Sequence, residues 1–252
     1  MIDNLKHLLK YFDLRSEIMT DFSVIDSGKL DQSIVSILKE RYYLKPSDIG
    51  NETFKELFLM IARTFESDYV IDSLNEKFIN DICLYIRFDK DFLKINPEFK
   101  SGKGLLILGS IGTGKTLILK TLSKILSLFA MDYYNYDNSF KIYPTYKIVG
   151  DFVTKGYEIF DSVSYYGYDK SIIGLDDLGA ETKIQYFGTP VNVLGEYIMR
   201  KYDRMLDRKK TILLCTTNLN GEQLKEFYGE RVHDRLIELV NPIVLTGKSR
   251  RK

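Results

Sequence analysis

Residues 104–126 read GLLIL, GSIGTGKT and LILKTLSKIL in succession, an apolar run, a glycine-rich loop and a second apolar pattern. The first run has the length and composition of a buried strand, and the leucines and isoleucines after the loop recur as on one helix face. Between a strand and a helix, the pattern G-x-x-x-x-G-K-[ST] predicts backbone N–H groups that converge on phosphate oxygens. We therefore expect a phosphate-binding loop at residues 109–116.

The loop also predicts which side chains contact a nucleotide. Lys115 would reach the β- and γ-phosphates, and the hydroxyl of Thr116 would bind Mg²⁺. ATP and Mg²⁺ are therefore the expected cofactors. The further candidates for nucleotide contacts are Gly109, Ser110, Ile111, Gly112, Thr113, Gly114 and Leu117.

A second candidate element is SIIGLDDLGAE, residues 171–181, in which strand-forming residues end at two aspartates. Carboxylates at the C-terminal end of a parallel strand face the ligand crevice of a doubly wound sheet. Asp176 would hold Mg²⁺ through its water shell, and Asp177 would orient or deprotonate an attacking water. Taken alone, the same pattern is also typical of a strand end followed by a turn.

The stretch TILLCTTNLN, residues 211–220, predicts a strand that ends in polar side chains. An uncharged amide beside the γ-phosphate can position the attacking water, and Asn218 is the candidate for this role. The alternative is that Asn218 begins a turn that leads to Asn220 and Gly221.

The segment YGERVHDRLIELV, residues 228–240, places Arg231 and Arg235 on one helix face. An arginine that enters a neighbouring subunit's site would stabilise charge on the γ-phosphate. Glu230 and Asp234 alternate with the arginines, so an intrahelical salt-bridge face is the competing interpretation.

Composition excludes several classes of protein. The 252 residues carry 36 basic and 35 acidic side chains, so global charge gives no argument for nucleic-acid binding. Local clusters at 200–210 (RKYDRMLDRKK) and 247–252 (GKSRRK) can line a phosphate backbone or form a solvated face and tail. Two distant cysteines, no membrane-length apolar run and no signal-peptide pattern lead us to expect a cytoplasmic protein without disulfides or membrane contact.

Apolar spacing predicts the order of the elements. Helical spacing over residues 1–66 indicates a small helical module, and a further helix is expected around 74–87. Strands are expected at 105–108, 141–148, 171–175, 211–215 and 242–245, with helices between the first four. This alternation predicts an α/β fold, with a parallel sheet covered on both faces.

Taken in order, these elements resemble the AAA+ ATPases, and within them the DnaC/IstB group of helicase loaders and transposition helper ATPases. The resemblance covers residues 67–251 and rests on GLLILGSIGTGKT, LDDLGAE, TTNL with its preceding Thr216, YGERVHDRL and the closing GKSRR. It implies a P-loop NTPase core with strand order 5-1-4-3-2 and no C-terminal lid. The resemblance implies nucleotide and metal contacts for Lys115 and Thr116, and the acidic pair for Asp176 and Asp177. It implies a sensor role for Asn218. It also implies an arginine finger in trans for Arg235, with Arg231 as its partner, and a substitute second sensor for Arg251.

The resemblance also implies a function and its partners. The expected function is an ATP-hydrolysing loader whose residues 1–66 bind a hexameric replicative helicase, while the AAA+ domain (67–252) grips single-stranded DNA. Its subunits would assemble into a hexamer or an open spiral. The alternative is a transposition helper that assembles on duplex DNA and recruits a transposase. A nucleotide-gated binding protein with negligible hydrolysis and a small-molecule P-loop kinase are the remaining hypotheses.

Overall fold

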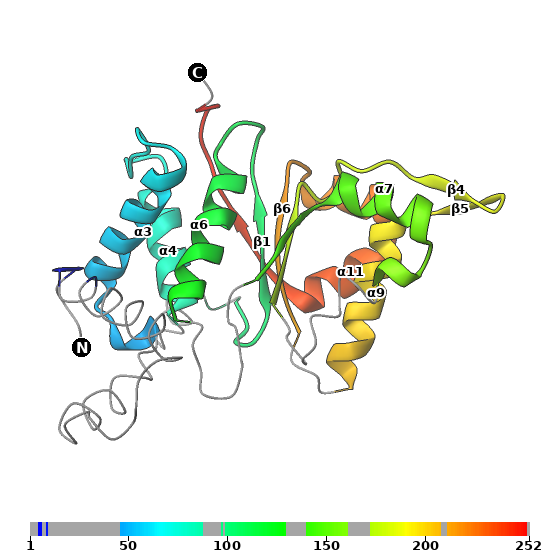
Figure 1. The fold of residues 1–252 in the computed structure, drawn as a ribbon, viewed down its shortest axis with the longest axis horizontal. Helices are drawn as coiled ribbons and strands as arrows, with labels where there is room; N and C mark the ends of the chain where they lie inside the picture. Colours follow the sequence, from blue (N-terminus) through cyan, green and yellow to red (C-terminus); the bar gives the residue numbers. More distant parts are fainter. Residues whose placement is uncertain are drawn as a thin grey trace, which may run out of the picture.

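The computed structural model describes residues 46–87, 97, 99–129, 140–160, 172–207 and 211–250, together with residues 5, 6 and 9. A five-stranded sheet lies at its centre (Figure 1). Its strands are β1 (Gly104–Leu108), β2 (Ile142–Pro144), β3 (Ile172–Asp176), β6 (Ile212–Thr217) and β7 (Val240–Val244). The strand order is β2-β3-β6-β1-β7, and all four neighbouring pairs are parallel.

This order confirms the predicted fold class. Counted along the chain, the five sheet strands stand in the order 2-3-4-1-5, which is 5-1-4-3-2 from the opposite edge. Strands β1 and β6 are almost wholly buried, as expected of strands covered by helices on both faces. The order places β1 between β6 and β7, so the loop after β1 lies beside the ends of both strands.

Helices cover both faces of the sheet (Figure 1). One face carries α3 (Asn51–Phe65), α4 (Glu76–Ile86) and α6 (Lys115–Leu128), which share one hydrophobic cluster. The other carries α7 (Thr145–Lys155), α9 (Val193–Leu206), α10 (Gly221–Tyr228) and α11 (Glu230–Leu239), which share a second cluster. A short 3-10 helix, η1 (Pro46–Asp48), precedes α3, and an antiparallel hairpin of β4 (Ile184–Tyr186) and β5 (Thr189–Val191) follows β3.

One predicted strand is wrong over half of its length. The expectation of a strand at 141–148 holds only for β2, because helix α7 begins at Thr145. Ile148, Val149 and Phe152 recur at helical spacing and are all buried against the second cluster. The β-branched and aromatic residues of this stretch therefore pack from a helix face, and tertiary burial overrides their strand preference.

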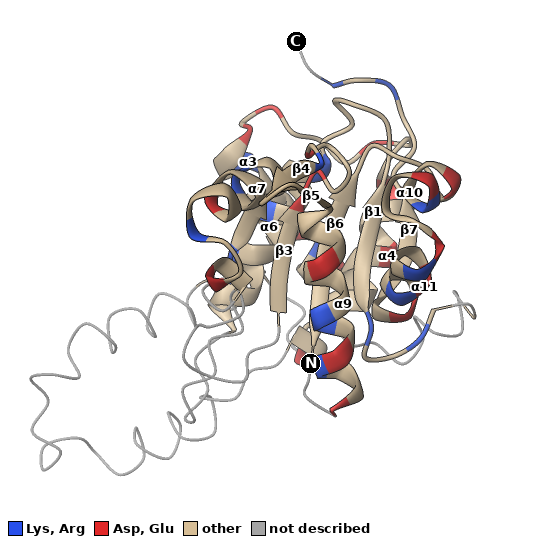
Figure 2. Ribbon diagram, turned by 90° about the vertical axis from the view of Figure 1, so that its right-hand side faces the viewer, with Lys and Arg blue, Asp and Glu red and all other residues tan. Residues whose placement is uncertain are grey.

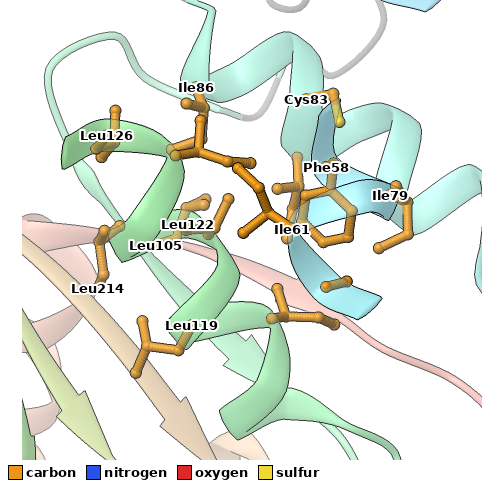
Figure 3. Packing of buried hydrophobic residues seen from close by; sticks show 14 of the residues in the cluster. Phe58, Ile61, Ile79, Cys83, Ile86, Leu105, Leu119, Leu122, Leu126 and Leu214 are labelled. Atoms are coloured by element: carbon orange, nitrogen blue, oxygen red, sulfur yellow. The ribbon is translucent and has the colours of Figure 1, made fainter. Parts of the chain in front are cut away.

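Helix α3 belongs to the core that supports the phosphate-binding loop. Phe54, Leu57 and Phe58 are fully buried in the same cluster as Leu119 and Leu122 of α6. Figure 3 shows Phe58 and Ile61 of α3 directed toward α6. The predicted boundary at residue 66 therefore passes through a core that α3 shares with α6.

Three further observations bear on the sequence-based expectations. Among the described residues, no helix has both the length and the apolar character needed to cross a membrane. The described residues that follow β7, 245–250, form no helix. Cys83 and Cys215 are both buried free thiols, and burial raises the pKa of each to about 12.

Candidate nucleotide-binding site

The loop between β1 and α6 has the backbone form that the motif requires. Gly112 and Gly114 adopt positive φ angles of 81° and 97°, a region that favours glycine. A side chain at Gly112 would also collide with Ser249, whose Oγ lies 2.2 Å from the position of an added Cβ. Gly114 immediately precedes the helix, so the first N–H groups of α6 face the loop.

Lys115 is held at the base of this loop by three oxygen atoms. Its Nζ donates to the carbonyl oxygens of Gly109 and Ser110, at 2.8 and 2.9 Å, and to Asn218 Oδ1 at 2.6 Å. The residue is only 5% exposed. Thr113 supports the same loop because its hydroxyl donates to the Ser110 carbonyl at 2.9 Å.

Asn218 connects the lysine to an acidic residue. Its Oδ1 accepts from Lys115, and its Nδ2 donates to Asp177 Oδ1 at 3.4 Å. Because an ammonium only donates and a carboxylate only accepts, these two neighbours fix which way the amide points. The three side chains form a relay of cation, amide and carboxylate that joins the ends of β3 and β6 to the loop after β1.

The other aspartate, Asp176, is bonded to two threonine hydroxyls. Asp176 Oδ1 accepts from the hydroxyls of Thr116, at 3.0 Å, and Thr216, at 2.6 Å. Hydroxyl and carboxylate oxygens are the hard donors that Mg²⁺ takes, usually one or two from the protein with the rest from phosphates and water. Thr116 and Asp176 therefore fit the predicted magnesium contacts.

Asp177 occupies an uncommon backbone conformation. Its φ is 61°, in the left-handed region where aspartate is one of the few tolerated side chains. Hydrogen bonds hold it on both sides, since its N–H donates to Thr216 Oγ1 at 2.9 Å and its carbonyl accepts from Thr145 Oγ1 at 2.8 Å. The strained turn aims the Asp177 side chain into the cavity above the loop, as residues at functional sites often do.

A cavity of about 420 Å³ joins these groups, a size within the range of small-molecule sites. Eight of the predicted residues line it, namely Ile111, Gly112, Gly114, Lys115, Thr116, Leu117, Asp177 and Asn218. The sequence analysis missed five others, which are Glu66, Asp68, Tyr69, Val70 and Arg250. Arg251 lies outside the described residues, and the neighbouring Arg250 reaches the cavity.

The two candidate finger arginines lie away from this cavity on helix α11. The side chain of Arg235 pairs with Glu238 at 2.8 Å and stacks over the ring of Tyr202 at 4.3 Å. Arg231 is exposed. Neither side chain lines the cavity of its own chain.

The basic cluster at 200–210 does not lie wholly on one exposed face that could bind DNA. Lys201 is 1% exposed, and burial lowers its pKa to about 8, so it cannot lie on a DNA-binding face. Arg200 is exposed and lies over the rings of Tyr157 and Phe160, while 208–210 lie outside the described residues. Figure 2 shows ribbon segments of basic and acidic residues interspersed along α9, α10 and α11.

Comparisons with known proteins give limited similarity. No protein-family model matches the chain, and no curated protein matches it. A crystal structure of the DnaC helicase loader is 17% identical with a TM-score of 0.44, and the match covers 72% of this chain and 95% of that one. AMPPCP-bound DnaA from Aquifex aeolicus is 13% identical with a TM-score of 0.45, and the match covers 71% of this chain and 49% of that one. Because both TM-scores lie below 0.5, we base the fold class on the strand order and the site on its own geometry.

Thr216 contacts both Asp176 and Asp177, and this supporting role was not evident from the sequence. Its hydroxyl donates to the Asp176 carboxylate and accepts from the Asp177 N–H, so it fixes both aspartates. Thr216→Val keeps the shape and removes both bonds. We expect the Mg²⁺ concentration for half-maximal nucleotide hydrolysis to rise about tenfold. Loss of a residue that supports a metal ligand usually weakens metal affinity by about ten- to a hundredfold, and this value is at the lower end.

The matched control is Thr154→Val, because the Thr154 hydroxyl bonds only to Asp151 within helix α7. Magnesium titrations of both variants measure the effect. Equal magnesium dependence in the Thr216 and Thr154 variants would contradict this role.

Proposed function

We propose that this chain is an AAA+ ATPase of the DnaC/IstB group, and that it loads a replicative helicase on single-stranded DNA. The observation that supports ATP hydrolysis is the relay from Lys115 through Asn218 to Asp177 at the rim of one cavity. Asn218 thereby holds the Lys115 ammonium, which is suited to bind phosphate, close to the Asp177 carboxylate, which is suited to accept a proton from water. The loader role rests on the ordered set of motifs in the sequence.

Binding of the triphosphate is the first step of the proposed cycle. The N–H groups of residues 109–116 and the start of α6 would surround the β- and γ-phosphates. Lys115 would exchange its carbonyl contacts for phosphate oxygens, while Asn218 keeps the ammonium aimed at the cavity. Thr116 and Asp176 would hold Mg²⁺, which neutralises charge on the phosphates when bound.

Activation of water follows from the same geometry. Asp177 lines the cavity and would accept the proton of the attacking water. Asn218 donates to Asp177 and accepts from Lys115, so the carboxylate cannot turn away without breaking that bond. A carboxylate fixed in this position favours transfer of the γ-phosphoryl group to the attacking water.

A neighbouring subunit completes the proposed site. Arg235 is fixed at the surface of α11 by Tyr202 and Glu238, and its side chain is 35% exposed. In an assembly it would exchange Glu238 for the γ-phosphate of the next subunit, and Arg231 would assist from the same face. Subunits would thus form a spiral or ring that depends on ATP.

The helicase-binding part of the chain is proposed to lie before residue 46. Helix α3 packs into the core that it shares with α6, so we propose that the part of the chain before it contacts the partner. Of these, Leu5 and Leu9 pack against the cluster that contains α3, which gives the segment an anchor on the ATPase.

The proposed function is tested by ATP hydrolysis measured alone, with single-stranded DNA, with duplex DNA and with the replicative helicase of the same source. We expect stimulation by single-stranded DNA and a complex with the helicase. A response confined to duplex DNA, without helicase binding, would contradict the loader and support the transposition helper. No hydrolysis under any condition would support the nucleotide-gated binding protein.

The shared site is tested by mixing two inactive variants. Arg235→Ala and Asp177→Asn should each bind ATP and hydrolyse little of it alone. A random equimolar mixture should recover about a quarter of the wild-type sites, because an intact Asp177 then meets an intact Arg235 at that frequency. The control is Lys225→Ala, which breaks only an exposed ion pair with Glu230. A mixture no more active than its components would count against a finger in trans.

A further inference from the structure

The cavity has a second wall, the segment 66–72 between α3 and α4, of which Glu66, Asp68, Tyr69 and Val70 line the cavity. Tyr69 is 6% exposed there, and its carbonyl accepts from Arg63 Nε at 3.0 Å. The buried side chain of Asn75 donates to the Val70 carbonyl at 3.1 Å and accepts from the Asp72 N–H at 2.8 Å. These bonds fix the wall's backbone before any ligand arrives.

The C-terminal tail runs along the phosphate-binding loop. Leu245 N–H donates to the Leu108 carbonyl at 2.7 Å, and Arg250 N–H donates to the Gly112 carbonyl at 2.8 Å. Ser249 packs directly against Gly112. Figure 1 shows the C-terminus and the α3–α4 connection at the same end of the molecule as the loop after β1.

One ion pair joins this tail to the second wall. Arg250 Nη2 donates to Asp72 Oδ1 at 2.8 Å, across 178 positions of the sequence. The Arg250 hydrogen bond lowers the pKa of the Asp72 carboxyl, and Asp72 raises the pKa of the guanidinium. Leu74 N–H also donates to Asp72 Oδ1 at 3.0 Å, so the carboxylate is oriented toward the tail.

The loop and the second wall bring different charges to the cavity. Lys115 comes from the loop, where phosphates would bind, whereas Glu66 and Asp68 bring carboxylates from the second wall, and all three residues line the cavity. Those carboxylates repel phosphate and leave this wall to the uncharged nucleoside. Tyr69 and Val70 supply apolar surface of the kind that a base requires from the same wall.

We propose that Arg250 is a positioning residue that, through its ion pair with Asp72, holds the second wall at the spacing that binds the nucleoside part of the nucleotide. Its guanidinium is engaged with Asp72 and does not serve as a phosphate contact. The tail thus closes the part of the cavity that would hold the base. This inference rests on the proposed nucleotide site.

The test compares affinity for ATP with affinity for inorganic tripolyphosphate, which lacks a nucleoside. Both are measured by calorimetry with Mg²⁺ on the full chain and on Arg250→Ala, Asp72→Asn, the double variant and Arg250→Lys. Loss of a partly exposed ion pair predicts that each single variant binds ATP about three- to fivefold more weakly. Tripolyphosphate affinity should not change. The double variant should be no weaker than either single variant, and Arg250→Lys should recover part of the loss.

The matched control is Lys248→Ala, an exposed cation in the same tail that does not line the cavity. It should bind both ligands as the wild type does. Equal weakening of ATP and tripolyphosphate by Arg250→Ala would show a phosphate contact and overturn the positioning role, and unchanged ATP affinity would overturn it too. A wild type that binds neither ligand would overturn the nucleotide site itself, and this inference with it.

Discussion

The hydrogen bond from Lys115 Nζ to Asn218 Oδ1, 2.6 Å long, is the contact on which the site depends. It exists because β1 and β6 are parallel neighbours, with Leu108 opposite Thr217, so the residues that follow both strands emerge at one edge. Strand β3 pairs with the other side of β6 and delivers Asp176 and Asp177 to the same edge. The strand order thereby turns three distant segments into one site. If β1 and β6 were not neighbours, Lys115 would lose its contact with Asn218, and the two strands could not bring this amide between Lys115 and Asp177.

The described structure explains why the nucleotide loop is surrounded by irregular segments. The tail after β7 packs against Gly112, where only hydrogen fits, and the residues between α3 and α4 form the opposite wall. Both segments expose backbone groups, and side chains such as Asn75 and Arg63 satisfy several of them. Because buried polar groups are costly when unpaired, these bonds stabilise the conformation of the segment between α3 and α4. The cavity is therefore shaped by specific side-chain bonds along the second wall and by the backbone geometry of loop and helix on the other side.

The proposed phosphate-binding loop has local signals in the sequence, and the structure brings eight of the predicted residues to one cavity. The spacing of Gly109, Gly114 and Lys115 specifies a loop form, and an apolar run that ends in Asp176 and Asp177 specifies a strand end. The second wall has no comparable signal. Tyr69, Asp72 and Arg250 meet only through packing of α3 on α6 and of the tail on the loop, contacts between positions far apart in the chain. Local spacing also failed at Lys201, whose basic neighbours suggested an exposed face although the helix turns it into the core.

Nucleotide binding by the loop after β1 is the claim on which the rest depends. The most direct measurement is the affinity of Mg·ATP for the full chain and for Lys115→Ala, with circular dichroism to confirm that both are folded. We predict saturable binding by the wild type and loss of at least about a hundredfold in the variant, because a charge-assisted contact to phosphate is removed. Equal affinity in a folded Lys115→Ala protein would contradict the assignment of this loop as the nucleotide site.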